Sequence, residues 1–207
     1  YYIINIYALA HLMLSLSMES GIIYFGSKAA IEPGKLLNLA VLWTLFVTVL
    51  LWIAGAVFIN FSYQSISRSL LITSSLTFIG GHLLYNYSSG LFYAQKNFMV
   101  PNVISLFFNV ILIIILPYQA FKLIPGITNN NYFYFYFYSF LAQGICTTAA
   151  FKLLNNDGIN FNLPSISAIK KLLQYSLLAL TGNIAFFLLY RIDYWFVNKY
   201  CLLADLG

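Results

Sequence analysis

The stretch from Lys170 to Tyr200 constrains the fold of this chain more than any other. Its residues 172–190 are long and apolar enough to cross a bilayer, yet Arg191 and Asp193 continue it without a turn signal. Ionisable groups at membrane depth are costly, so they normally face protein or a water-filled cavity rather than lipid. The stretch therefore predicts a polytopic membrane protein with a solvated interior.

Polar and apolar side chains separate when this stretch is placed on a helix at about 100° per residue. Ser176, Asn183 and Tyr190 fall on one line, with Arg191 on one side of it and Asp193 on the other. The opposite face carries mostly leucine and aromatic residues. One face suits lipid or packed helices and the other suits a polar ligand, which is the pattern expected of a transporter.

Arg191 and Asp193 need partners beyond their own helix, because about 200° of rotation separates them. Arginine binds a phosphate or carboxylate with two hydrogen bonds, while an aspartate positions the arginine or takes up a proton. Two alternatives stay open for the pair. The residues pair with other helices as packing groups, or they lie at the outer interface and extend toward water.

The composition excludes an ordinary soluble domain. Charged residues make up 7% of the chain and apolar residues 61%, against about 25% charged residues in globular domains. The net charge of +5 is assigned to loop lysines that orient the spans and contact anionic lipids, and not to nucleic-acid binding. The chain begins and ends beside apolar segments, so we expect an internal piece of a longer protein.

Six segments each supply the roughly 20 apolar residues that a spanning helix needs. The fifth opens with the run YFYFYFY, which we interpret as an interfacial aromatic belt at a helix start, because an open strand in lipid leaves its backbone unpaired. The expected fold is an all-α polytopic membrane protein with six transmembrane helices. The spans cover about 1–25, 36–61, 69–94, 98–121 and 132–151, followed by the stretch that begins at 172.

Basic residues are distributed unevenly between the loops. The loops after the first, third and fifth spans contain Lys28, Lys35, Lys96, Lys152, Lys170 and Lys171. The loops after the other spans contain only Arg68, Lys122 and Lys199. The positive-inside tendency places the first set in the cytoplasm. The polar loop that follows residue 152 is the expected boundary between two helical bundles.

Two further spans carry polar stripes. In the first span, His11, Ser15 and Glu19 share a face, and Glu19 is a candidate site for a proton or cation. The alternative is a carboxylate that simply reaches water at the cytoplasmic end. In the third span, His82 and Asn86 fall on a stripe that favours cavity lining, although a hydrogen-bonded packing role for His82 stays open. The same stripe includes Ser75, Ser89 and Tyr93.

Signatures of covalent chemistry are missing from the sequence. No nucleophile and base, metal-ligand spacing or phosphate-binding glycine loop is present, and the two histidines are far apart in the chain. We therefore expect no catalytic residues, no metal and no cofactor.

Three stretches carry a resemblance to a known family: MESGIIYFGSKAA at 18–30, FYAQKNFMVPNVISL at 92–106 and LLQYSLLALTGNIAFFLLYRIDYWFVNKYCLLADLG at 172–207. They resemble bacterial polysaccharide-biosynthesis flippases, the Wzx-like exporters of O-antigen and capsule repeat units, in the multidrug/oligosaccharidyl-lipid/polysaccharide exporter superfamily. The resemblance implies a protein of twelve to fourteen helices. Residues 1–152 would supply helices two to six of its N-terminal lobe, residues 153–171 the cytoplasmic interlobe linker, and residues 172–207 the first helix of its C-terminal lobe.

The resemblance implies a flippase of the bacterial inner membrane that works by alternating access. Its cargo would be an undecaprenyl-diphosphate-linked oligosaccharide, its partners membrane lipids and a monovalent cation or proton. The residues expected to line the substrate cavity are Arg191, Asp193, Asn183, Tyr190, Ser176, Glu19, His82 and Asn86. One alternative is a cation- or proton-coupled multidrug exporter of the same superfamily. A second is a membrane-embedded glycan polymerase or ligase, which the short external loops disfavour.

Overall fold

A computed structural model describes residues 2–58, 68–120, 129–155 and 162–200. Near several helix ends, residues 190–200 among them, only the backbone is described. The described residues form seven helices and no strands, so the prediction of an all-α protein is confirmed for them. The helices are α1 (Tyr2–Ser15), α2 (Met18–Ser27), α3 (Pro33–Phe58), α4 (Arg68–Ala94), α5 (Met99–Ala120), α6 (Asn129–Leu154) and α7 (Ile166–Tyr200).

Two of the described helices are long and apolar enough to cross a membrane, namely Pro33–Val57 of α3 and Ile166–Leu189 of α7. A third candidate arises when the bent pair α1 and α2 is counted as one span. Both helices leave large apolar side chains such as Phe46, Trp52 and Phe186 more than half exposed. Such faces suit acyl chains rather than water, so the chain is suited to association with a membrane.

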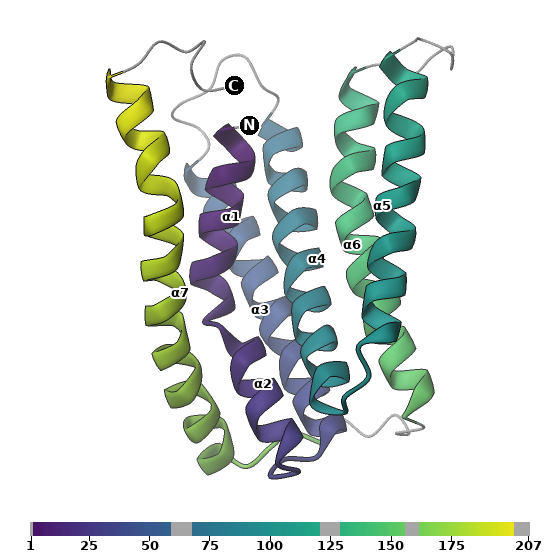
Figure 1. Ribbon diagram of the computed structural model, residues 1–207, viewed down its shortest axis with the longest axis vertical. Helices are drawn as coiled ribbons and strands as arrows, with labels where there is room; N and C mark the ends of the chain where they lie inside the picture. The colour runs from purple at the N-terminus through teal and green to yellow at the C-terminus, as the bar shows by residue number, and fades with distance from the viewer. Residues whose placement is uncertain (1, 59–67, 121–128, 156–161, 201–207) are drawn as a thin grey trace.

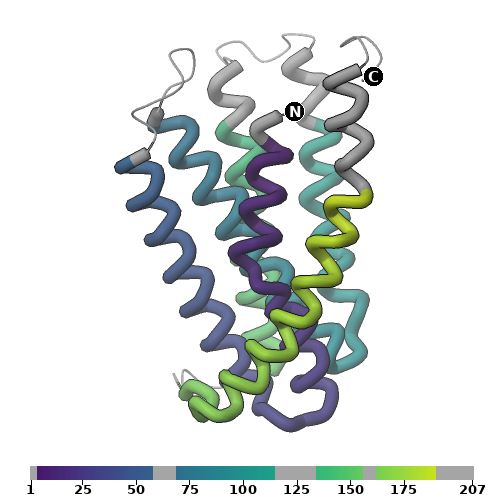
Figure 2. The backbone as a smooth tube through the Cα atoms, turned by 90° about the vertical axis from the view of Figure 1, so that its left-hand side faces the viewer, coloured from purple at the N-terminus to yellow at the C-terminus, as the bar shows by residue number. Residues whose placement is uncertain are grey.

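The bundle is organised around α4, which packs against α1, α2, α3, α5 and α6. Figure 1 shows α7 and the α1–α2 pair on one side of α4, and α5 and α6 on the other. In Figure 2, turned by 90°, α3 separates from the other helices as the left-hand edge of the bundle. Among the described helices, α7 packs mainly against α2 and α1. Polar groups of α7 that point into the described bundle therefore face these two helices.

One end of the bundle collects the lysine-bearing segments. The C-terminal ends of α2, α4 and α6 and the N-terminal ends of α3, α5 and α7 all lie at the lower end in Figure 1. The six lysines that the sequence assigns to the cytoplasmic side lie within or beside these ends. The fold therefore concentrates positive charge at one end, as the loop distribution predicts.

Glycine permits a close contact between the backbones of α4 and α6. A Cβ atom built on Gly144 would lie 2.5 Å from the carbonyl oxygen of Gly81, and one built on Gly81 would lie equally close to the backbone of Phe140. The neighbouring Gly80 faces Thr48 of α3 instead. Small residues at a helix interface let the two backbones approach this closely.

The aromatic run at the start of α6 is helical, as predicted, and one of its rings lies in the core. Phe137 is 1% exposed and packs edge-on against Tyr7 and Phe78, whereas Tyr138 remains exposed. Successive residues of a helix point about 100° apart, so a continuous aromatic run must turn some rings into the bundle. This geometry puts Phe137 in the core.

Candidate functional site

The first helical segment is interrupted at Leu16 and Ser17, which separate α1 from α2. Both residues have positive φ, 49° and 50°, and the two helices are bent by 44°. A left-handed conformation costs a non-glycine residue about 1–2 kcal/mol, so it persists only where its surroundings hold it. The continuous face predicted for His11, Ser15 and Glu19 is thus divided between two helices, with Glu19 in the first turn of α2.

Side chains from α3 and α4 hold the interruption in place. The indole Nε1 of Trp43 donates to the carbonyl oxygen of Leu14 at 3.0 Å, and the hydroxyl of Tyr87 donates to that of Ser15 at 2.9 Å. The Ser15 hydroxyl also accepts the backbone N–H of Ser17 at 3.2 Å. Backbone groups released by the break therefore have partners, as buried backbone groups require in an apolar medium.

The break lies near the middle of the bundle's depth. Ten residues of α2 follow it, and at 1.5 Å per residue they span about 15 Å. This is half of the roughly 30 Å thickness of a bilayer's hydrocarbon core. Ser176 of α7 lies against Gly21, three residues into α2. The polar groups beside the break are therefore far from both ends of the bundle.

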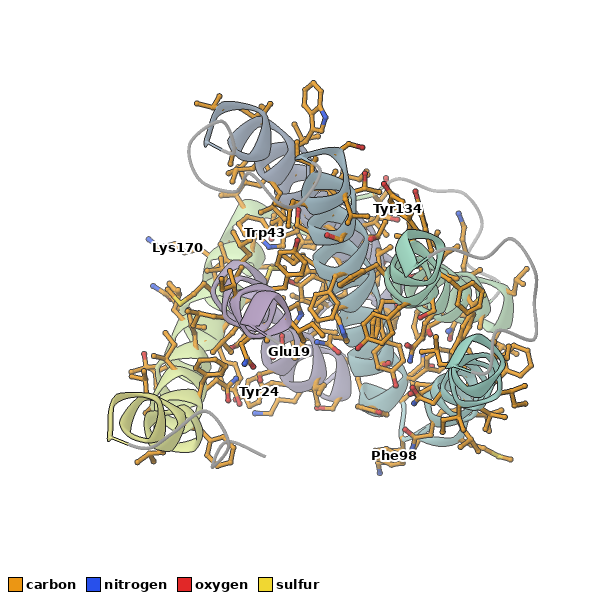
Figure 3. All side chains as sticks on the ribbon, turned by 90° about the horizontal axis from the view of Figure 1, so that it is seen from above. Glu19, Tyr24, Trp43, Phe98, Tyr134 and Lys170 are labelled. Carbon is orange, nitrogen blue, oxygen red and sulfur yellow. The ribbon has the colours of Figure 1, made fainter. Side chains whose placement is uncertain are left out.

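Glu19 is the acidic residue at this level. It is partly buried, and its Oε2 is enclosed with no hydrogen-bond partner. The N-terminal turn of a helix stabilises a carboxylate through the partial positive charge of its free N–H groups. The backbone of Glu19 packs against Gly90 of α4, and Figure 3 shows the residue near the centre of the bundle. The orphan oxygen can accept a proton or a cationic or hydroxyl group of a ligand.

The helix α7 brings two of the predicted residues to the break. The side-chain amide of Asn183 donates to the hydroxyl of Ser17 at 2.9 Å. Ser176 is 0% exposed, and its Oγ has no hydrogen-bond partner and lies directly against Gly21 of α2. The two residues fall on one line of α7 in the sequence, and the structure turns that line toward α2.

The two histidines form a second polar cluster, between α1 and α4. The ring centroids of His11 and His82 are 5.6 Å apart, and Asn86 donates to Nε2 of His11 at 3.3 Å. His82 also stacks on Phe140 at 4.6 Å. The structure thus joins His82 and Asn86 to a residue of another helix. Among the described residues, no group of three or more metal-binding side chains occurs.

Three predicted site residues are not tested by this geometry. The backbone of α7 continues as a helix through Tyr190, Arg191 and Asp193, but their side chains lie outside the described residues. Their placement in a cavity stays a prediction.

Sequence reasoning missed Trp43, Tyr87 and Ser17. The tryptophan and tyrosine look like ordinary core or interface aromatics, and nothing in the sequence tells which carbonyl they bond. Ser17 did carry a signal, because a serine followed by Glu19 is typical of a helix start. That pattern inside an apolar segment indicates a helix that restarts.

Comparisons of the chain with protein-family models, with curated proteins and with solved structures found no match. Its function must therefore be inferred from the site itself.

The arrangement supplies hydroxyl, amide, imidazole and carboxyl groups from α1, α2, α4 and α7 in the interior of the bundle. Among the described residues, three buried side-chain oxygens have no hydrogen-bond partner, and they come from three helices: Glu19, Ser89 and Ser176. Burying such groups without partners is costly, which makes these three oxygens candidates for contact with water or a bound polar molecule. The groups are suited to binding a polar molecule and to accepting a proton.

Proposed function

We propose that the protein is a transporter of the bacterial inner membrane that flips undecaprenyl-diphosphate-linked oligosaccharides by alternating access. The observation that carries the proposal is the interrupted helix α1–α2, which is fixed by α3 and α4 and contacted by Asn183 of α7. Secondary transporters commonly place a discontinuous helix at their substrate site near the middle of the membrane.

In this proposal, α1 and α2 form one span and α3 to α7 form the other five, which gives six transmembrane helices. The helix α7 begins the second lobe, and the segment between α6 and α7 is the cytoplasmic linker. The helix α7 makes few contacts with α3 to α6. This supports the division, because a helix of the second lobe has to move relative to the first lobe.

Charge favours an anionic cargo. The lysine-rich end of the bundle attracts a diphosphate from the cytoplasmic side, and Arg191 would offer a further cation deeper in α7. The hydroxyl and amide groups beside the break suit the sugars, which need hydrogen-bonding partners during passage. Glu19 is the single acidic residue that the described structure has at the break. One carboxylate does not define a site for cationic drugs by its charge alone.

Glu19 nevertheless favours a second candidate, a proton- or cation-coupled multidrug exporter. Its unpartnered Oε2 lies at the break, where a bound proton or cation would change the charge of the site. In a flippase the same group would serve ion coupling. The two candidates therefore differ in cargo and not in the use of Glu19.

The test uses proteoliposomes that contain a fluorescent undecaprenyl-diphosphate oligosaccharide, with the label in each leaflet measured by quenching from outside. We expect the protein to equilibrate the label between leaflets, and Asn183→Leu to slow this strongly. Thr181→Val is the matched control, since Thr181 is exposed on the same helix and bonds only within it.

The outcomes separate the candidates. Failure to move the labelled lipid, together with proton-driven export of a cationic dye that Glu19→Gln abolishes, would assign the protein to drug export. A change in the length of the glycan would instead indicate a polymerase or ligase.

A further inference from the structure

Two tyrosines from different helices stack near the lysine-rich end of the bundle. The rings of Tyr24 on α2 and Tyr175 on α7 are 4.5 Å apart between centroids and inclined by 17°. Phe25 contacts both rings edge-on, at 5.1 Å and 6.2 Å. Tyr175 is 40% exposed, so the stack is held from one side and remains accessible from another. We call Tyr24 and Tyr175 the tyrosine platform.

A lysine accompanies each tyrosine one helical turn away. Lys28 donates from Nζ to the hydroxyl of Tyr24 at 2.6 Å and lies 4.1 Å from the centre of its ring. Lys171 precedes Tyr175 by four residues, which places both on one face of α7. Because α2 and α7 run in opposite directions, both lysines lie on the same side of the platform, toward the lysine-rich end (Figure 1).

This combination of groups matches a particular headgroup. The faces of sugar rings are apolar and pack on aromatic rings, while lysine ammonium groups bind phosphate oxygens by charge-assisted hydrogen bonds. Both lysines are exposed, and Lys171 has no ion pair with any described residue. A phosphate would thus meet two cations beside a surface for its attached sugar.

The platform also stands close to the break. Tyr24 is six residues after Met18, so about 9 Å of helix separates the two levels. The same two helices, α2 and α7, build both places through Tyr24 with Tyr175 and Ser17 with Asn183. The platform therefore lies between the lysine-rich end and the break, on the same pair of helices.

We propose that Tyr24, Tyr175, Lys28 and Lys171 form a docking site for the glycosyl-diphosphate headgroup of a lipid-linked sugar at the cytoplasmic end. The proposal rests on the proposed function and adds to it the place where the substrate first binds. An anionic phospholipid offers the same phosphate chemistry without the sugar, so the test must separate these two sources.

Adjacent lysines provide a matched pair of variants. Lys171→Ala removes a platform lysine, whereas Lys170→Ala removes the same charge from the next position, where Figure 3 shows Lys170 directed away from Tyr24. Tyr175→Leu removes the aromatic face and keeps apolar bulk, and Tyr138→Leu does the same at an exposed position of α6. All these side chains are exposed, so the variants are expected to fold, and a thermal unfolding scan checks this.

The experiment measures binding to the purified protein with three probes: undecaprenyl diphosphate carrying an oligosaccharide, undecaprenyl diphosphate alone, and phosphatidylglycerol. We expect Lys171→Ala to weaken binding of both diphosphates by about tenfold, the effect of losing one charge-assisted bond. Tyr175→Leu should weaken only the sugar-bearing probe. Neither control variant should change binding more than about twofold.

Two results would overturn the docking site. If Lys171→Ala and Tyr175→Leu bind the sugar-bearing lipid like the unchanged protein, the headgroup binds elsewhere, even though the protein still flips it. If phosphatidylglycerol binding falls as much as binding of the sugar-bearing lipid, the site serves membrane lipid. Absence of any binding by the unchanged protein would instead refute the proposed function itself.

Discussion

Tyr87 shows how one hydroxyl can support an entire interruption of a helix. It is fully buried, and its bond to the Ser15 carbonyl satisfies a group that the break removes from the helical pattern. Without this partner the carbonyl would be buried and unpaired, which costs about 1–3 kcal/mol.

We therefore predict that Tyr87→Phe lowers the stability of the protein by about 1–3 kcal/mol. Thermal unfolding in detergent should show a clear fall in Tm. Tyr138→Phe, at an exposed position, is the control and should leave Tm unchanged. An unchanged Tm for Tyr87→Phe would mean that the break does not depend on this bond.

Arg191 is the residue whose chemistry best matches a diphosphate, since a guanidinium binds two phosphate oxygens at once. We predict that Arg191→Ala abolishes complementation of a flippase-deficient strain, while the protein still inserts into the membrane. Surface glycan is measured by gel and insertion by immunoblot of membranes. Normal surface glycan in the variant would remove Arg191 from the transport site.

Ser15 and Glu19 test whether water reaches the break. Cysteines placed singly at these positions should react with a small thiol reagent supplied from the cytoplasmic side, because the inward-open state of the proposed transporter would admit water to the break. Thr44, buried on α3, provides the protected control. Complete protection of both positions would favour a packing role for Glu19.

At the scale of the elements, α4 and α6 depend on glycine for their contact. An alanine at position 144 would press its Cβ against the Gly81 carbonyl, and a backbone atom cannot yield as a side chain can. Overpacking of this kind costs about 1–3 kcal/mol. The contact of α7 with α2 at Gly21 has a softer neighbour, the hydroxyl of Ser176.

We predict that Gly144→Ala destabilises the bundle by about 1–3 kcal/mol, as measured by thermal unfolding in detergent. Gly182→Ala is the matched control, because open space surrounds that position in α7 and alanine is the better helix former. Its stability should stay equal or rise by up to about 1 kcal/mol. Equal destabilisation by the two changes would show that loss of glycine, and not the α4–α6 contact, is responsible.

At the scale of the whole molecule, the lysines define a direction. Six of them lie at one end of the bundle, and a membrane protein retains such an excess on the cytoplasmic side. In the proposed orientation the tyrosine platform faces the cytoplasm, as the proposed docking site requires.

We predict that Lys152→Cys reacts with an impermeant maleimide only in inverted membrane vesicles. Ser69 is exposed at the N-terminal end of α4, at the other end of the bundle from Lys152. Ser69→Cys should therefore react in intact cells whose outer membrane has been opened. Cys146 and Cys201 are first replaced by serine. The reverse labelling pattern would invert the orientation and place the platform outside.

The sequence by itself determined the helical class, the approximate bounds of most helices and the lysine-rich end. These follow from hydropathy over about 20 residues and from loop charge, which are local properties that survive without knowledge of packing. It also put Ser176 and Asn183 on one face, since helical periodicity alone settles which residues of one helix share a side.

Only the tertiary structure decided what lies opposite those faces. It interrupted the first segment at Leu16 and Ser17, because Trp43 and Tyr87 from other helices satisfy the carbonyls that the break exposes. It also paired His11 with His82, and Tyr24 with Tyr175, across long separations in the chain. Contacts between helices depend on their rotation and relative depth, and no local pattern in the sequence encodes either one.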